Sequence, residues 1–286
     1  MGRGTADLVA QTPQPDLGKS QYIMTLRILT AVVAIPAIFG ILWVGTLAVA
    51  VVALIAASIS GWELADMVRA RKNCPLRWAY VGWPISLVSA GWLIAENQLD
   101  WLVLPSLIVA GMIPALYLLV TGRRTPFVYS LAAGPYVGLT LAHAPVLRSS
   151  ENGMEWLLFA LIVTFTADTA AMFIGVAFGR HKLITRISPK KSWEGVVGGL
   201  VGGGISAFII GMVFDLQINS MVVVGLGLAM AIAGTLGDLG ESAFKRHAAV
   251  KDSGFLIPGH GGVLDRLDSL MPNLLIVYWA SEWSAT

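Results

Sequence analysis

Long apolar runs, separated by short polar stretches, dominate the pattern of this chain of 286 residues. A run of roughly 17–25 apolar residues is long enough to cross the hydrocarbon core of a bilayer as a helix. The pattern therefore predicts an all-α, polytopic integral membrane protein with about nine transmembrane helices. We place these helices near residues 26–43, 46–66, 79–95, 101–120, 126–147, 155–177, 195–214, 220–240 and 269–283.

The composition agrees with a membrane protein and excludes an ordinary soluble domain. The chain is 56% hydrophobic and 13% charged, whereas soluble domains carry about a quarter of charged residues. The single cysteine, Cys74, excludes an intramolecular disulfide and a Cys-rich metal site. Residues 1–25 are polar, do not have the form of a signal peptide and are predicted to be flexible.

The basic residues predict the orientation of the chain. With nine spans, eighteen of the nineteen Lys and Arg fall on the side of the N-terminus, and only Arg148 falls on the other. Because positive charge collects in cytoplasmic loops, this side is expected to face the cytoplasm. We divide the chain into the segment 1–25, the N-terminal transmembrane helices of 26–154 and a C-terminal catalytic region of 155–286.

Tryptophans and glycines are interpreted as features of membrane helices. Most tryptophans lie near predicted span ends, as expected for interfacial anchors, and we expect no nucleic-acid partner. The glycines of the seventh span predict a small-residue face for close helix packing. They are Gly198, Gly199, Gly202, Gly203 and Gly204.

Carboxylates lie inside or at the predicted cytoplasmic ends of apolar spans. They are Asp168, Asp238, Asp265 and Asp268. An unpaired carboxylate in hydrocarbon is costly, so each needs a cation, a basic partner or a watery cavity. One alternative is internal salt bridging, for example of Asp238 or Glu241 with Lys245. The grouping of the carboxylates favours a shared metal site, for which Mg²⁺ suits the hard oxygen ligands.

A basic loop joins the sixth and seventh spans and contains Ser188, Lys190 and Lys191. Ser192 is predicted to cap the following helix, with Glu194 in its first turn. Lysines beside a helix N-terminus are typical of a phosphate site. The alternative is nonspecific binding of anionic lipid headgroups by a positively charged loop, but the neighbouring carboxylates favour Mg²⁺-nucleotide chemistry.

Two further polar residues leave their roles open. His260 lies in a Pro-Gly-His-Gly-Gly turn, where it either orients a phosphate or caps the turn. Glu63 lies in the second span, and we expect it to make a structural hydrogen bond to another span.

The stretch 242–268 resembles the signature of the phosphatidate cytidylyltransferase family, also called CDP-diacylglycerol synthase. The segments ISPKKSWEG and the surroundings of Asp168 also resemble motifs of this family, so the similarity covers about residues 160–272. The residues that fit the signature are Ser242, Lys245, Arg246, Lys251, Asp252, Gly254, Pro258, His260, Gly261, Gly262, Asp265, Arg266 and Asp268.

The resemblance implies a dimeric membrane enzyme that makes CDP-diacylglycerol and pyrophosphate from CTP and phosphatidic acid. It implies Mg²⁺, helped by K⁺, with Asp238 and Asp265 as the main metal ligands. Asp168 and Asp268 complete the candidate metal site. The expected location is the bacterial plasma membrane, among its lipids, with the active site facing the cytoplasm.

We hypothesise that the lipid phosphate attacks the α-phosphorus of CTP and that Lys and Arg side chains hold the phosphates. The candidate catalytic residues are Asp238, Asp265, Lys245, Arg246, Lys251 and His260. The candidate substrate-binding residues are Ser188, Lys190, Lys191, Lys245, Arg246, Lys251, Asp252 and Arg266. The alternatives are a cytidylyltransferase for another lipid phosphate and an ion-coupled membrane transporter.

Overall fold

A computed structural model describes residues 36–72, 77–96, 131–216, 218–250, 252–254 and 261–284. The segment predicted to be flexible, the span predicted near 101–120 and most of the first span lie outside the described residues. The number of nine spans therefore stays a prediction.

Apolar helices make up most of the described chain and confirm an all-α membrane protein. The longest are α2 (Thr46–Lys72), α7 (Gly153–Phe178), α8 (Trp193–Val213) and α9 (Ser220–His247). Each of these four has a stretch that is long and apolar enough to cross a membrane, and Tyr80–Ala95 within α3 (Trp78–Ala95) forms a shorter apolar helix. Their positions match the predicted segments, because an apolar run in a membrane satisfies its backbone groups internally as a helix.

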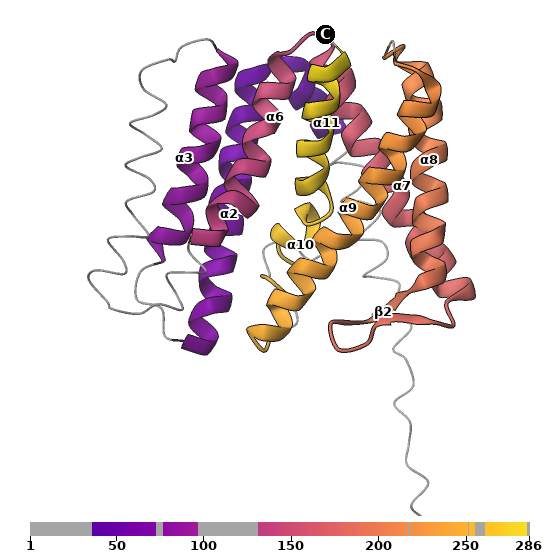
Figure 1. The fold of residues 1–286 in the computed structure, drawn as a ribbon. Coiled ribbons are helices and arrows are strands. Elements are labelled where there is room, and N and C mark those ends of the chain that lie inside the picture. The colour runs from indigo at the N-terminus through magenta and orange to yellow at the C-terminus, as the bar shows by residue number, and fades with distance from the viewer. Residues whose placement is uncertain are drawn as a thin grey trace, which may run out of the picture.

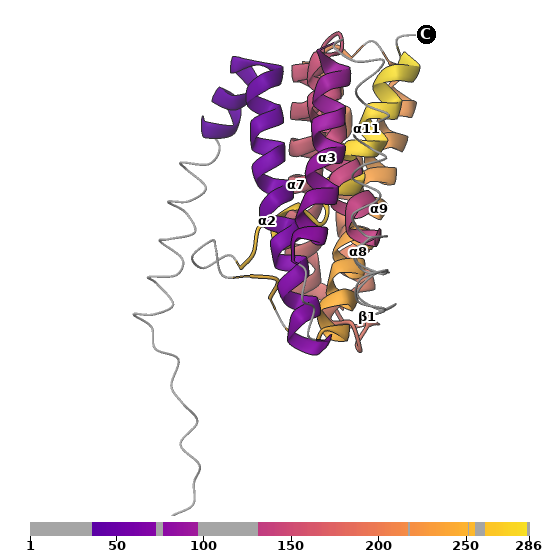
Figure 2. The same cartoon turned by 90° about the vertical axis from the view of Figure 1, so that its left-hand side faces the viewer.

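The remaining helices are shorter or irregular. The predicted span 126–147 is described from residue 131 and contains the π-helix η1 (Gly134–Leu139), followed directly by α6 (Thr140–Ser149). The last predicted span, 269–283, is formed by α11 (Leu270–Ser284), and the single turn α10 (Leu264–Leu267) precedes it. The long helices run side by side, with α2 and α3 at one side and α7, α8 and α9 at the other (Figures 1 and 2).

A small hairpin between α7 and α8 was not predicted. Strands β1 (Lys182–Ile184) and β2 (Ser188–Ser192) pair antiparallel and lie at one end of the bundle (Figure 1). The predicted helix cap that follows is confirmed, because the Ser192 hydroxyl accepts a hydrogen bond of 3.2 Å from the backbone N–H of Gly195. The cap fixes where β2 ends and α8 begins.

The predicted glycine face of α8 is confirmed and draws three helices together. A Cβ atom added to Gly202 would lie 2.5 Å from the Ala170 side chain of α7, and one added to Gly203 would lie 2.9 Å from the Gly227 carbonyl of α9. Backbones that approach this closely leave no room for side chains, as in other membrane helix interfaces. Helices α7, α8 and α9 therefore form one tightly packed unit.

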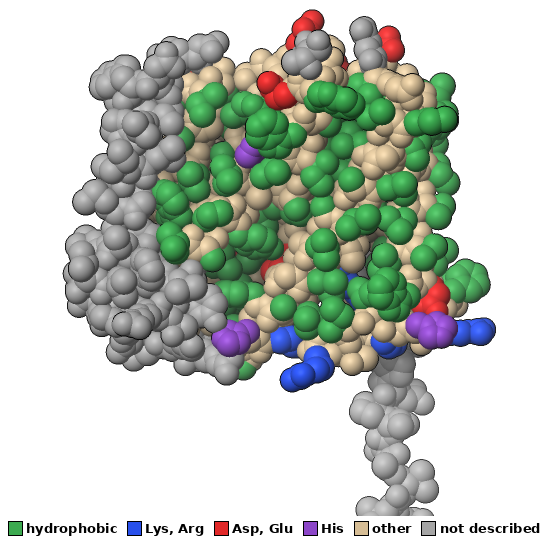
Figure 3. Space-filling model, in the orientation of Figure 1, with side chains coloured by type: hydrophobic (Ala, Val, Ile, Leu, Met, Phe, Trp, Pro, Cys, Tyr) green, Lys and Arg blue, Asp and Glu red, His purple; other side chains and the backbone are tan. Residues whose placement is uncertain are grey.

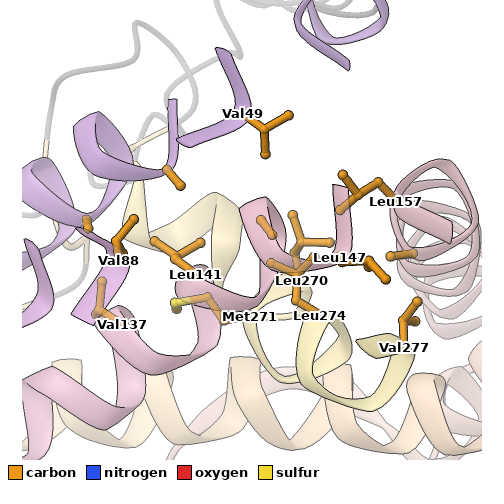
Figure 4. Packing of buried hydrophobic residues seen from close by; sticks show 14 of the residues in the cluster. Val49, Val88, Val137, Leu141, Leu147, Leu157, Leu270, Met271, Leu274 and Val277 are labelled. Atoms are coloured by element: carbon orange, nitrogen blue, oxygen red, sulfur yellow. The ribbon is translucent and has the colours of Figure 1, made fainter. Parts of the chain in front are cut away.

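A second packing centre surrounds α11. Its Met271, Leu274 and Val277 are almost fully buried and belong to a cluster that also includes Val137 and Leu147 (Figure 4). This cluster connects α11 with the N-terminal helices and so fixes the position of the turn that precedes α11.

The outer surface is apolar along the helices and charged at their ends. Hydrophobic side chains cover the middle of the bundle. Lys and Arg gather at the hairpin end, where acidic side chains also lie, whereas on this face the charged side chains at the opposite end are Asp and Glu (Figure 3). Such a surface suits lipid tails around the middle and water at both ends.

Candidate active site

A cavity of about 840 Å³ opens at the hairpin end of the bundle, between α7, α8, α9, α10 and β2. It collects side chains that are far apart in the sequence. Its charged lining residues are Asp168, Lys190, Lys191, Asp238, Lys245, Asp252, Asp265, Arg266 and Asp268. All of these were singled out from the sequence, and all four candidate metal ligands are among them.

The cavity wall formed by α7 is apolar. Met172 and Val176 line the cavity, and they are also 57% and 84% exposed on the surface of the molecule. The polar cavity is therefore bordered by side chains that face the surroundings of the bundle.

One ion pair joins the hairpin to α9. The Lys191 ammonium lies 2.8 Å from the Asp238 carboxylate and donates a hydrogen bond of 3.3 Å to the Thr235 carbonyl. The Ser242 hydroxyl donates to the other Asp238 oxygen at 3.2 Å. Asp238 is thereby held in one orientation, with a lysine of the phosphate-site motif beside it.

A second ion pair joins α9 to α10. The Lys245 ammonium lies 2.6 Å from Asp265 Oδ1, and the backbone N–H groups of Ser253 and Gly262 donate to Oδ2 at 3.1 and 3.0 Å. Burial opposes ionisation of Asp265, but its interaction with Glu241 and the hydrogen bonds from Lys245 and the backbone hold its pKa well below the usual value. Asp265 is therefore a carboxylate in the working pH range.

Internal salt bridging, the alternative to a metal site, is present in part. Lys245 lies 3.5 Å from Glu241, as that alternative proposed, but its shorter contact is with Asp265. Glu241 is 2% exposed, and in the described part of the chain neither of its oxygens has a good hydrogen bond. Glu241 does not line the cavity.

Asp268 is a further carboxylate in the lining of the cavity. Its carboxylate accepts a hydrogen bond of 2.7 Å from the backbone N–H of Ser269. Burial raises the pKa of Asp268, and the negative charges of Asp238 and Asp168 add to the effect. A bound cation would relieve this repulsion.

The donor chemistry of the cavity fits Mg²⁺. Within the described ranges, no three His, Cys, Asp or Glu side chains already stand close enough to hold an ion. However, Mg²⁺ keeps several waters and is usually held by one or two carboxylates plus substrate phosphates. Carboxylates that line a cavity together with lysines meet that requirement without a complete cage of protein ligands.

The other predicted site residues lie at the edge of the cavity or outside the described residues. Arg246 donates from Nε to the Ile187 carbonyl of the hairpin at 3.2 Å, and Ser188 pairs with Ile184 in the hairpin. Neither lines the cavity. Lys251 and His260 lie outside the described residues, and their roles stay predictions.

Glu63 of α2 lies next to the site, although the sequence analysis did not place it there. Its buried carboxylate accepts hydrogen bonds of 2.9 Å from the backbone N–H groups of both Val263 and Leu264. The expected hydrogen bond to another span is thus made instead to the turn that begins α10. The sequence signal was only a carboxylate within an apolar run, which does not reveal a backbone partner.

Fold and site together define an integral membrane protein with a polar, ion-paired cavity suited to phosphate-bearing ligands. The model of the cytidylyltransferase family matches residues 25–283, and the chain belongs to this family. It is therefore an enzyme of the nucleotidyltransferase class, and such activity is generally metal-assisted.

Curated relatives from staphylococci cover nearly the same length. The phosphatidate cytidylyltransferase of Staphylococcus aureus (strain COL) is 35% identical over 254 residues, which are 87% of this chain and 95% of the relative. Those of Staphylococcus haemolyticus and Staphylococcus epidermidis are 34% identical over 254 residues, with the same shares covered.

Proposed function

We propose that this enzyme is a phosphatidate cytidylyltransferase, which forms CDP-diacylglycerol and pyrophosphate from CTP and phosphatidic acid. The observation that carries the proposal is the convergence of Asp238, Asp265, Lys191 and Lys245 on one cavity beside an apolar wall. The activity named for the staphylococcal relatives supports the choice of substrates.

In the proposed reaction, a non-bridging oxygen of the lipid phosphate forms a bond to the α-phosphorus of CTP. The bond from the α-phosphorus to the oxygen that bridges to the β-phosphate breaks, and pyrophosphate leaves with the electron pair. A phosphate monoester is already anionic, so the reaction requires no strong general base. The main barrier is the repulsion between negatively charged groups, which positioned cations lower.

The residues of the cavity have distinct roles in this reaction. Lys190 and Lys191 reach the cavity from β2, and Lys245 reaches it from α9; all three are proposed to bind phosphate oxygens. Asp238 and Asp265 are the proposed principal Mg²⁺ ligands, assisted by Asp168 and Asp268. Bound Mg²⁺ would neutralise the phosphates and the leaving group, and we include K⁺ as a helper from the family resemblance.

Two further properties belong to the proposal. The cavity is proposed to face the cytoplasm, where CTP is available, and the enzyme is proposed to act as a homodimer. A membrane-impermeant maleimide tests the orientation, because Cys74 lies in a predicted cytoplasmic loop and is the only cysteine. It should label Cys74 in inside-out vesicles and not in sealed cells. Light scattering of the purified protein should give twice the mass of the 30.4 kDa chain.

The decisive assay combines purified enzyme, CTP labelled in the α-phosphate, phosphatidic acid and Mg²⁺. The expected result is a labelled lipid and one pyrophosphate for each lipid formed. An isoprenoid ether lipid phosphate in place of phosphatidic acid serves as the comparison substrate. Labelling of the comparison substrate alone would assign the enzyme to another lipid, and the absence of any labelled lipid would contradict the proposal.

A further inference from the structure

Glu63 connects the N-terminal half of the bundle to the loop that carries Asp265. It is 6% exposed and lies in α2, about 190 residues before its nearest hydrogen-bonding partner in the sequence. One carboxylate oxygen accepts from the backbone N–H of Val263. The other accepts from the Leu264 N–H at 2.9 Å and from the Ser253 hydroxyl at 3.1 Å.

The same two loop segments hold Asp265 on their other side. Ser253 donates from its hydroxyl to Glu63 and from its backbone N–H to Asp265 Oδ2. Gly262 donates its N–H to the same Asp265 oxygen, and Val263 and Leu264 directly precede Asp265. Two carboxylates, Glu63 from α2 and Asp265 from α10, therefore hold the loop segments 252–254 and 261–264 between them through hydrogen bonds. We call this arrangement the clamp.

The loop backbone packs closely against the Glu63 carboxylate. A Cβ atom at Gly262 would lie 2.5 Å from a Glu63 oxygen and would also collide with the Ser253 hydroxyl. A Cβ atom at Gly254 would lie 2.5 Å from the other Glu63 oxygen. Glycine at these two positions lets the loop backbone press against the carboxylate, which leaves Glu63 little freedom to adopt another geometry.

We propose that Glu63 is a positioning residue for the reaction, acting through the loop to set the orientation of Asp265. The inference rests on the proposed function, in which Asp265 binds Mg²⁺. Groups that hydrogen-bond around a metal ligand set its orientation, and their loss typically lowers metal affinity or activity about 10–100-fold. Glu63 does not contact Asp265 directly. It hydrogen-bonds the backbone N–H groups of Val263 and Leu264, the two residues that precede Asp265 in the chain.

Glu63→Gln tests the proposal because glutamine has nearly the same shape. Its NH₂ group must replace one carboxylate oxygen and then faces a loop N–H, so one hydrogen bond is replaced by a donor–donor contact. The expected result is a Mg²⁺ concentration for half-maximal activity that rises about tenfold, with little change in KM for phosphatidic acid. Glu282→Gln, at the exposed end of α11, is the matched control and should behave as wild type.

A second measurement separates this inference from the proposed function. Mg²⁺ added with CTP but without phosphatidic acid should raise the melting temperature of the wild type and of Glu282→Gln, and should raise that of Glu63→Gln only at higher Mg²⁺ concentrations. This readout needs no turnover, whereas the wild-type rate alone tests the proposed function. If Glu63→Gln does not fold, Ser253→Ala removes one bond of the clamp and should shift the Mg²⁺ dependence in the same direction, by less. Wild-type Mg²⁺ dependence in a folded variant, by both readouts, would overturn the proposal.

Discussion

The Lys245 ammonium lies 2.6 Å from the Asp265 carboxylate, although the two residues belong to different helices and are twenty positions apart. The short contact places the end of α9 against the start of α10. Each charge compensates the other in a partly buried position, so that neither is left unpaired near the membrane.

The first prediction concerns the two principal carboxylates. Asp238→Asn and Asp265→Asn each remove a negative charge that faces a lysine at less than 3 Å. We expect each change to lower Mg²⁺-dependent CTP incorporation by more than about 100-fold while the protein remains folded. Labelled lipid formation and thermal unfolding are the measurements. Asp215→Asn, at an exposed turn after α8, is the control, and near-normal rates in both site variants would contradict the metal assignment.

The second prediction concerns Lys191. Lys191→Met removes an ammonium from the cavity but keeps most of the side-chain length, and it removes the ion-pair partner of Asp238. A hydrogen bond to a charged group contributes about 1.5–3 kcal/mol, so KM for CTP should rise about tenfold or more. Steady-state kinetics with varied CTP is the measurement. Lys182→Met, an exposed position of β1 outside the cavity lining, should leave KM unchanged, and equal effects of the two changes would argue for a general charge effect.

The third prediction concerns the helix cap at Ser192. Ser192→Ala removes the acceptor for the Gly195 N–H and should lower the free energy of unfolding by about 1 kcal/mol. Ser192→Asn retains a capping oxygen and should restore part of this loss. The melting temperatures of the two variants in the same detergent are the measurement. Equal values would show that the cap does not stabilise the start of α8.

The fourth prediction concerns two adjacent glycines of α8. A Cβ atom at Gly203 would lie 2.9 Å from the backbone carbonyl of Gly227, whereas one at Gly204 would lie 3.5 Å from the nearest side chain. Gly203→Ala should therefore destabilise the enzyme by about 1–3 kcal/mol. Gly204→Ala should be neutral or slightly stabilising, because alanine favours the helix. Melting temperatures compare the two, and similar values would argue against close packing of α8 and α9.

The positions of the apolar helices could be predicted from the sequence because a membrane leaves an apolar run few alternatives to a helix. The charged lining of the cavity could also be predicted, since carboxylates within such runs need a cation or a basic partner. The hairpin could not, because β1 and β2 are short and charged and show no alternating pattern. The hydrogen bonds from Val263 and Leu264 to Glu63 could not be predicted either, because their donors are backbone N–H groups, which do not depend on the residue type.

Met172 and Val176 line the polar cavity and are also exposed on the flank of the bundle. A substrate with two fatty chains therefore need not leave the bilayer to present its phosphate, whereas a nucleotide must arrive from water. The enzyme is then expected to follow interfacial kinetics. Its rate should depend on the mole fraction of phosphatidic acid in mixed micelles. Adding inert detergent should therefore slow the reaction even when the bulk concentration of phosphatidic acid is kept constant.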